Sequence, residues 1–120
     1  MDLVELIKAL AHENRLRILN LLKEKSLCVC ELRNIMDINQ SNASRHLKKL
    51  KNVGLVESYK EAQWVYYQLS LTKIDQHPFI KELLEKEFAQ QKLFQQDKNN
   101  LELYNKSKIN CDSLDNADLF

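Results

Sequence analysis

Glycine and proline are almost missing from this 120-residue chain, which has one of each, Gly54 and Pro78. Their scarcity excludes a glycine-rich phosphate loop, a dinucleotide-binding fingerprint, collagen and most all-β folds. No apolar run approaches the ~18 residues that a membrane-spanning helix needs. The opening segment MDLVELIK has acidic residues and no basic region ahead of its apolar residues, unlike a signal peptide. We therefore expect a cytoplasmic protein that does not enter a membrane.

Cysteine is rare too, with three residues at Cys28, Cys30 and Cys111. An odd number of cysteines in a chain without a leader favours thiol chemistry in a reducing compartment over a disulfide framework. Hydrophobic residues make up 44% and charged residues 29% of the chain, which is typical of a globular protein and too apolar for wholesale disorder. A length of 120 residues leaves room for one domain.

The formal net charge of +1 conceals an uneven distribution. The last ten residues contain three aspartates and no basic residue, so residues 1–110 carry +4. From Arg45 to Lys60 there are five basic residues against one acidic residue, Glu57. Such a segment is either a solvated helix face or a surface that binds phosphates.

Apolar residues recur at helical spacing along the first half of the chain. The segment Asp37–Asn39 is typical of a tight turn, and Gly54 is placed to end the helix that follows it. Ser26 is suited to cap the helix before that turn. The predicted helices cover residues 2–10, 14–25, 27–36 and 40–53.

The hydrophobic period then changes from 3.6 to 2. Residues 55–60 and 63–69 are rich in β-branched and aromatic side chains, so we predict a β-hairpin. Because Ala62 lacks the freedom of glycine at positive φ, we expect a turn longer or looser than two residues. A last helix is predicted to begin near Pro78, with Asp75 or His77 as its cap.

Apolar residues become sparse from Gln95 onward, while asparagine and aspartate accumulate. This composition is typical of a segment that buries little surface. We therefore predict one folded domain over residues 1–96 and a polar, acidic, mobile C-terminal tail over residues 97–120.

The order of the elements predicts a mostly α fold with a small β-hairpin, arranged as a winged helix-turn-helix. The helix over residues 40–53 is suited to the major groove of DNA, because its apolar stripe is narrow and its polar first turn can reach base edges. The alternative is a solvated helix in a small bundle. Candidate DNA-binding residues are Gln40, Ser41, Asn42, Ser44, Arg45 and His46 in the groove, and Lys48, Lys49 and Lys60 on phosphates.

Four stretches of the chain resemble the ArsR/SmtB family of metal- and metalloid-sensing repressors. The resemblance covers about residues 3–90, and LCVCEL resembles the metalloid-binding helix of the arsenic-responsive members. It implies a homodimer joined through its first and last helices, which binds double-stranded operator DNA and is released by an inducer. The four stretches are ALAHENRLRILNLL (9–22), LCVCEL (27–32), QSNASRHLKKLKNVGLV (40–56) and WVYYQL (64–69).

Cys28 and Cys30 are the most distinctive chemical feature. Thiolates select soft species such as As(III), Sb(III), Cd(II), Pb(II), Zn(II) or Cu(I). On a regular helix over residues 27–36, positions i and i+2 point roughly 200° apart. Chelation would therefore unwind the first turn of that helix and disturb the recognition helix packed on it. The alternative is that one of these cysteines is only a small buried hydrophobe.

A third metal ligand is less clear from the sequence. Some arsenic sensors have a third cysteine three residues after the second, where this chain has Arg33. A three-coordinate site would then use Cys111, a small thiol or water, and the alternative is that the pair binds in a two-thiolate mode. Asp75 and His77 match the beginning of the family's other metal site, but the later positions of that site are not ligands here. We therefore interpret these two residues as capping and turn residues.

We predict a repressor of a metalloid-resistance operon that leaves its operator when As(III) or Sb(III) binds Cys28 and Cys30. No cofactor is expected to stay permanently bound, and other thiophilic metals are alternative inducers. The same scaffold sensing Cd(II) or Pb(II), or a thiol redox or persulfide state, is the main alternative. A winged helix that binds protein is another. An enzyme is not expected, because no base or oxyanion loop accompanies Cys28 in the sequence.

Overall fold

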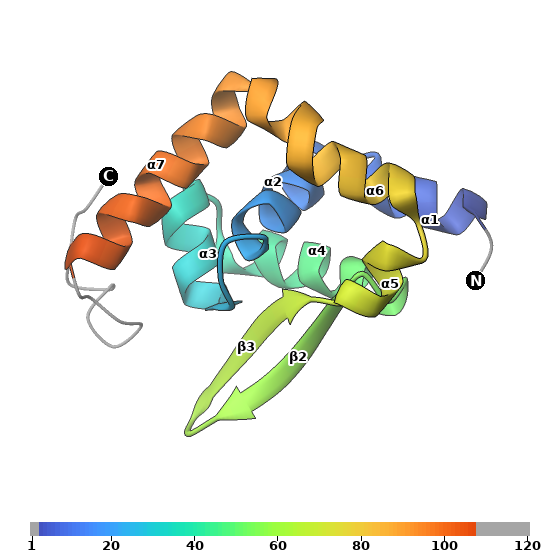
Figure 1. Ribbon diagram of the computed structural model, residues 1–120. Coiled ribbons are helices and arrows are strands. Elements are labelled where there is room, and N and C mark those ends of the chain that lie inside the picture. The colour runs from blue at the N-terminus through green and yellow to red at the C-terminus, as the bar shows by residue number, and fades with distance from the viewer. Residues whose placement is uncertain (1–2, 108–120) are drawn as a thin grey trace.

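The computed structural model describes residues 3–107, in which helices surround α2 and a three-stranded antiparallel sheet with the order β1-β3-β2 extends from one side (Figure 1). This confirms the predicted mostly α fold with a β-hairpin. The elements are α1 (Leu3–Leu10), α2 (Glu13–Leu22), β1 (Leu27–Cys28), α3 (Val29–Met36), α4 (Gln40–Asn52), β2 (Val56–Glu61), β3 (Trp64–Leu69), α5 (Leu71–Asp75), α6 (Pro78–Glu82), the π-helical turn η1 (Leu83–Glu87), the 3₁₀ turn η2 (Phe88–Gln90) and α7 (Lys92–Ser107).

The hydrophobic core lies where α2, α3 and α4 meet. Ala43, Leu47 and Leu50 form the predicted narrow stripe of α4, and all three are fully buried. They meet residues such as Ile18 of α2 and Leu32 of α3, which are buried as well. Burying one leucine side chain stabilises a fold by roughly 1.5–3 kcal/mol. The core thus fixes α4 on α3 while the polar side of α4 stays exposed.

No helix in the described part of the chain is long and apolar enough to cross a membrane.

A tight turn joins α3 to α4, as the sequence predicts. Asp37 ends α3 in the left-handed conformation, with a φ of 55°. Asn39 then caps α4, because its side-chain oxygen accepts the backbone N–H of Asn42 at 2.8 Å. After α4, Gly54 has a φ of 81°, the conformation that favours glycine at a helix end. These local contacts set the direction in which α4 leaves the core.

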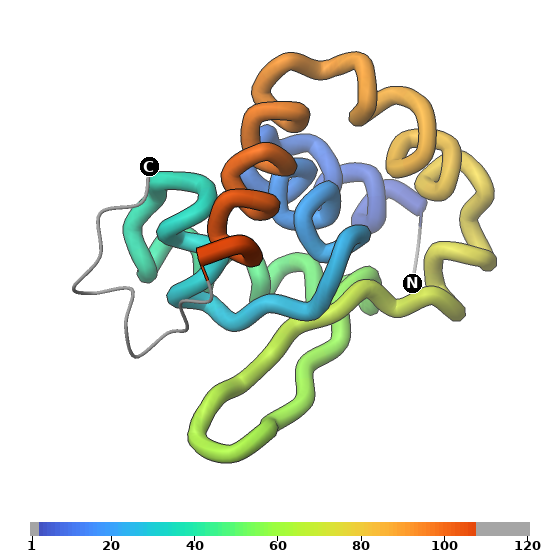
Figure 2. The backbone as a smooth tube through the Cα atoms, turned by 60° about the vertical axis from the view of Figure 1, so that its left-hand side comes forward, coloured from blue at the N-terminus to red at the C-terminus, as the bar shows by residue number. Residues whose placement is uncertain are grey.

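The wing, formed by β2 and β3, differs from the prediction at its turn. The two strands pair in register from Val56 opposite Leu69 to Glu61 opposite Trp64, which leaves only two residues between them. Ala62 therefore adopts a φ of 57°. A two-residue turn with positive φ matches the twist of paired strands, so the strand pairing overrides the preference of alanine. Figures 1 and 2 show this hairpin projecting away from the helices.

The C-terminal region differs most from the prediction. The chain has turns at η1 and η2 and extended backbone at Gln91, and then α7 runs back along α2 and α3 (Figures 1 and 2). Asp97, Leu101 and Tyr104 of α7 are buried. The sequence predicts a mobile tail from residue 97 onward, but residues 97–107 form a packed helix. The reason is that these three side chains lie on one face of α7 and pack against α2 and α3. Residues 108–120 lie outside the described part.

Candidate DNA-binding surface and thiol site

The first turns of α4 present a polar surface to solvent. Asn42 is half-buried, and its Oδ1 accepts a hydrogen bond from Arg45 Nη2 at 2.6 Å. Ser41 donates to the capping side chain of Asn39 at 2.9 Å. The N-terminal end of this helix therefore offers exposed donors and acceptors of the kind that bind base edges. The predicted groove residues that are exposed are Gln40, Ser41, Ser44 and Arg45.

His46 is not available to DNA, which corrects its prediction as a groove or phosphate residue. Its side chain is 3% exposed, and its ring lies 4.3 Å from that of His12. Nδ1 of His46 accepts a hydrogen bond from Arg15 Nε at 3.3 Å. Burial, with the nearby charges of His12 and Arg15, lowers the pKa of His46 from 6.5 to about 4. The ring is thus a neutral part of the contact between α4 and α2.

Basic side chains continue the polar surface of α4 toward the wing. Lys48 and Lys49 are exposed, as phosphate-binding residues must be. Lys60, also exposed, lies on β2 beside the turn of the wing. Lys51 donates to Ser58 Oγ at 2.7 Å and so links α4 to β2. Exposed lysines thus lie on α4 and beside the turn of the wing, where Lys60 is flanked by the exposed acidic residues Glu57 and Glu61.

The two cysteines lie at the junction of strand and helix. Cys28 ends β1 in an extended conformation, with φ −91° and ψ 172°, and α3 begins only at Val29. Its sulfur is 3.4 Å from the sulfur of Cys30. The prediction that the two sulfurs point to opposite sides of one helix is therefore wrong. Cys28 pairs with Tyr66 of β3, and this pairing keeps Cys28 outside the helix.

A pocket of about 300 Å³ opens beside the two sulfurs. It extends from the start of α3 to the start of α4 and to the turn end of β3. Trp64, the single tryptophan of the chain, forms part of its wall. A ligand of Cys28 and Cys30 would therefore contact the recognition helix and the wing together. The lining residues are Cys28, Val29, Cys30, Arg33, Gln40, Trp64 and Val65.

Sequence reasoning missed Glu31, whose carboxylate is buried beside the thiol pair. Its Oε1 accepts the backbone N–H of Cys28 at 2.9 Å, and its Oε2 accepts the hydroxyl of Tyr104 on α7. Burial and the contact with Glu31 raise the pKa of Tyr104. The signal for Glu31 is its position three residues after the helix cap, the spacing of a capping box. No local pattern points to Tyr104.

The structure brings together no third metal ligand within residues 3–107, since it contains no group of three histidine, cysteine, aspartate or glutamate residues placed to hold a metal. Arg33, three residues after Cys30, lines the pocket. His77 occupies the cap position of α6, and its ring contacts Phe79 at 6.1 Å. Cys111, the predicted additional ligand, lies outside the described residues.

A recognition helix seated on a helical core, a basic flank and a hairpin wing define a DNA-binding transcriptional regulator of the winged helix-turn-helix class. The profile described as "Bacterial regulatory protein, arsR family" matches residues 12–58. The cadmium resistance transcriptional regulatory protein CadC homolog of Staphylococcus aureus is 40% identical over 93 residues, which are 77% of this chain and 72% of that protein. The chain therefore belongs to the arsR family of bacterial transcriptional regulators. The relatives that it matches are described as regulators of transcription and not as enzymes.

Further relatives agree with this assignment. The arsenical resistance operon repressor of Escherichia coli is 46% identical over 68 residues, 56% of this chain and 58% of that protein. Reduced HlyU from Vibrio cholerae has a TM-score of 0.59 at 44% identity, covering 67% of this chain and 82% of that one. The homodimeric winged helix-turn-helix DNA-binding domain Mb0332 from Mycobacterium bovis has a TM-score of 0.58 at 31% identity, covering 68% and 81%. The winged helix-turn-helix fold of this chain is thus a DNA-binding fold, and one of its solved neighbours is described as homodimeric.

Proposed function

We propose that this chain represses a metalloid-resistance operon and leaves its operator when As(III) or Sb(III) binds Cys28 and Cys30. The observation that carries the proposal is the 3.4 Å separation of the two sulfurs in a pocket that Gln40 and Trp64 also line. An inducer bound there would be in contact with both parts of the DNA-binding surface.

The distance between the sulfurs suits a single thiophilic ion. An ion that bonds each sulfur at about 2.3 Å, with a bond angle of roughly 90–110°, holds the sulfurs roughly 3.3–3.8 Å apart. The observed 3.4 Å lies in this interval. Chelation by Cys28 and Cys30 then needs no unwinding of α3, in contrast to the mechanism that the sequence suggested.

Release of DNA would instead follow from occupation of the pocket. Gln40 begins the recognition helix, while Trp64 and Val65 belong to the wing, and the three side chains share the pocket with the thiols. A bound ion and its remaining ligand would change the position of the wing relative to α4. Because operator binding requires one relative position, inducer and operator favour different states, and each weakens the affinity for the other.

The third ligand of a trivalent ion would be supplied by Cys111, by a small thiol or by water. Arg33 is not a ligand, since a guanidinium has no lone pair to give. Two thiolates within residues 3–107 and a third ligand from elsewhere agree with the residues that line the pocket. No cofactor is needed for DNA binding in this proposal.

We further propose that two copies join through α1 and the C-terminal helices. Leu3, Val4 and Ile7 form an exposed apolar strip on α1, and Phe79 of α6 is exposed as well. A protein of this size rarely leaves such large side chains together in water unless they meet a partner. The homodimeric structure from M. bovis supports dimerisation.

Fluorescence anisotropy with labelled operator DNA tests the function. We expect arsenite to release the wild-type protein, whereas Cys28→Ser and Cys30→Ser should bind operator normally and remain bound. Cys111→Ser separates a two-thiolate site, in which release is retained, from a site that needs the third cysteine. The fluorescence of Trp64 reports inducer binding independently of DNA. Release of Cys30→Ser by arsenite at the wild-type concentration would exclude the pair as the sensor.

Sensing of Cd(II) or Pb(II) is the second candidate, because the relative from S. aureus is described as a cadmium resistance regulator. Thiol redox or persulfide sensing by the same pair is the third. The same titration separates them, with Cd(II), Pb(II), peroxide or persulfide in place of arsenite. We expect arsenite to act at the lowest concentration, and a stronger response to Cd(II) would reassign the inducer.

A further inference from the structure

The C-terminal helix α7 reaches the thiol site through one buried carboxylate. Tyr104 lies near the end of α7, and its hydroxyl donates to Oε2 of Glu31. The other oxygen of Glu31 accepts the backbone N–H of Cys28 at 2.9 Å. Glu31 is 7% exposed and Tyr104 4% exposed, so water has little access to replace either contact. Two donors from distant parts of the chain thus hold one carboxylate.

We propose that Glu31 and Tyr104 are positioning residues for the thiol pair, so that docking of α7 sets how tightly Cys28 and Cys30 hold one soft atom. The proposal rests on the proposed function only for the identity of the inducer. The coupling itself concerns the geometry of the two sulfurs and applies to any atom that bridges them.

The backbone at Cys28 connects the carboxylate of Glu31 to the sulfur pair. The bond from its N–H to Glu31 holds the extended conformation that directs one sulfur toward the other, 3.4 Å away. Without the Tyr104 hydroxyl, the buried carboxylate loses one of its two donors and turns to find another. The backbone of Cys28 then loses its fixed partner. Loss of a group that orients a metal ligand typically lowers affinity by roughly 10–100-fold.

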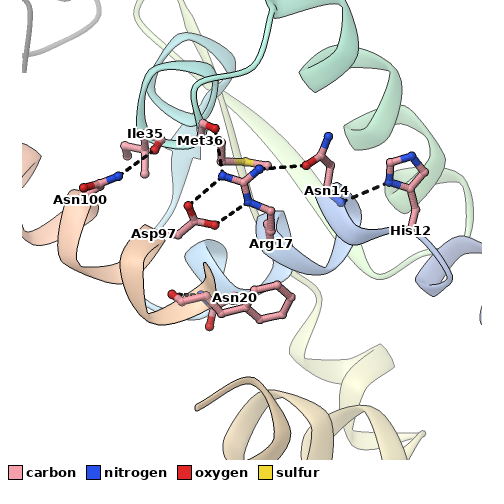
Figure 3. Close-up of polar contacts among 9 residues, drawn as sticks. His12, Asn14, Arg17, Asn20, Ile35, Met36, Asp97 and Asn100 are labelled. Atoms are coloured by element: carbon pink, nitrogen blue, oxygen red, sulfur yellow. Dashed lines mark hydrogen bonds and ion pairs between the residues drawn. The ribbon is translucent and has the colours of Figure 1, made fainter. Parts of the chain in front are cut away.

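The other contacts of α7 keep the helix in place when Tyr104 is changed. Asn20 donates to the carbonyl of Phe94 at 3.1 Å, and Asn100 donates to the carbonyl of Ile35 at 3.4 Å (Figure 3). Arg17 and Asp97 form a buried ion pair in the same region. Removing one hydroxyl from Tyr104 therefore changes the orientation of Glu31 while α7 stays docked.

Phenylarsine oxide is the probe for the first experiment. It condenses with two thiols to form two As–S bonds and releases one water, so it binds tightly only where one arsenic atom can bridge both sulfurs. In a Cys111→Ser background, the fluorescence of Trp64 follows binding at Cys28 and Cys30. We expect Tyr104→Phe and Glu31→Gln each to weaken binding by roughly tenfold or more.

Ser107→Ala is the matched control for Tyr104→Phe. It removes a hydroxyl from the same end of α7, where Ser107 donates to the backbone carbonyl of Tyr104 at 2.7 Å and not to the carboxylate of Glu31. We expect its affinity to stay within about twofold of the wild type. Equal affinities for Tyr104→Phe and Ser107→Ala would overturn the proposal.

Hydrogen exchange on the unmodified chain provides a test that needs no change at Glu31 or Tyr104. Coupling is reciprocal, so a bridging ligand must strengthen docking of α7 by the factor with which docking strengthens binding of the ligand. We expect phenylarsine oxide to slow amide exchange in the last turns of α7, near Tyr104, and to have no such effect on Cys28→Ser. Unchanged exchange in α7 on saturation would also refute the coupling.

The two proposals fail in different ways. If arsenite does not release operator from the wild type, the proposed function fails, whatever the probe does. If arsenite releases operator but Tyr104→Phe binds phenylarsine oxide like the wild type, only the positioning role fails.

Discussion

Arg17 and Asp97, eighty positions apart in the chain, form a two-pronged buried ion pair, with Nε 2.7 Å from Oδ2 and Nη2 2.9 Å from Oδ1. Their side chains are 10% and 2% exposed. Nη2 of Arg17 also donates to the carbonyl of Met36 at 2.9 Å (Figure 3). The hydrogen bond with Asp97 is the main reason why the pKa of Arg17 is raised. One guanidinium therefore connects α2, the end of α3 and α7.

Breaking this pair should destabilise the protein strongly. We expect Asp97→Leu to lower the free energy of unfolding by about 3–5 kcal/mol, because it leaves a buried guanidinium without its counter-charge. The double variant Arg17→Met with Asp97→Leu should recover most of the loss, since neither charge remains to be desolvated. Urea unfolding measures all four proteins of the cycle. Additive losses from the two positions would show that the pair is not coupled.

The neutral state of His46 predicts an acid-sensitive stability. Above about pH 6.5 the ring is uncharged in both the folded and the unfolded chain, so it contributes no pH dependence. Between about pH 6.5 and about pH 4, only the unfolded chain binds the proton, and stability falls as the pH falls. The full effect is at most about 3 kcal/mol. Below about pH 4 both states are protonated.

His46→Gln tests this dependence because it removes the proton-binding group from α4. We expect the variant to lose about 2 kcal/mol less than the wild type when the pH falls from about 7 to about 5, measured by urea unfolding. His77→Gln is a suitable control, since His77 lies at the cap of α6, where its ring contacts Phe79. Parallel pH profiles for wild type and His46→Gln would contradict a buried neutral ring.

The turn of the wing offers a stabilising substitution. Ala62 has a φ of 57°, a conformation that costs a residue with a Cβ about 1–2 kcal/mol. Ala62→Gly should therefore raise the free energy of unfolding by about 1 kcal/mol, after the greater flexibility of glycine in the unfolded chain is included. Ala62→Val should lower it, because a branched side chain fits this region worst. Thermal unfolding of the two variants checks the sign, and destabilisation by glycine would argue against the two-residue turn.

Lys48 and Lys49 should govern the salt dependence of DNA binding. Each exposed lysine that neutralises a phosphate adds about 0.9 to the slope of log affinity against log salt. We expect Lys48→Ala with Lys49→Ala to weaken operator binding and to reduce this slope by about 2 for each protomer. Lys92→Ala with Lys106→Ala, on α7, removes the same charge from another face and should leave the slope unchanged. If both double variants had the same slope of log affinity against log salt, Lys48 and Lys49 of α4 would not be phosphate contacts.

Local patterns were sufficient for the helix-turn-helix and the strands of the wing. Helical spacing predicted the buried stripe of Ala43, Leu47 and Leu50, and the residues from Asp37 to Asn39 predicted the tight turn between α3 and α4. These features depend on interactions between residues a few positions apart, so a short segment of the sequence is enough to predict them. The chemical identity of the thiol pair and the polar face of α4 followed from the same kind of reading.

The tertiary structure decided what depends on distant partners. Strand pairing with Tyr66 placed Cys28 outside α3 and brought the sulfurs together, and packing against Arg15 and His12 buried His46. The docking of α7 depends on Arg17 meeting Asp97, a contact that no local pattern encodes. The spacing of apolar residues along a segment shows which face of its helix is apolar. The surface that covers this face is formed by residues elsewhere in the chain.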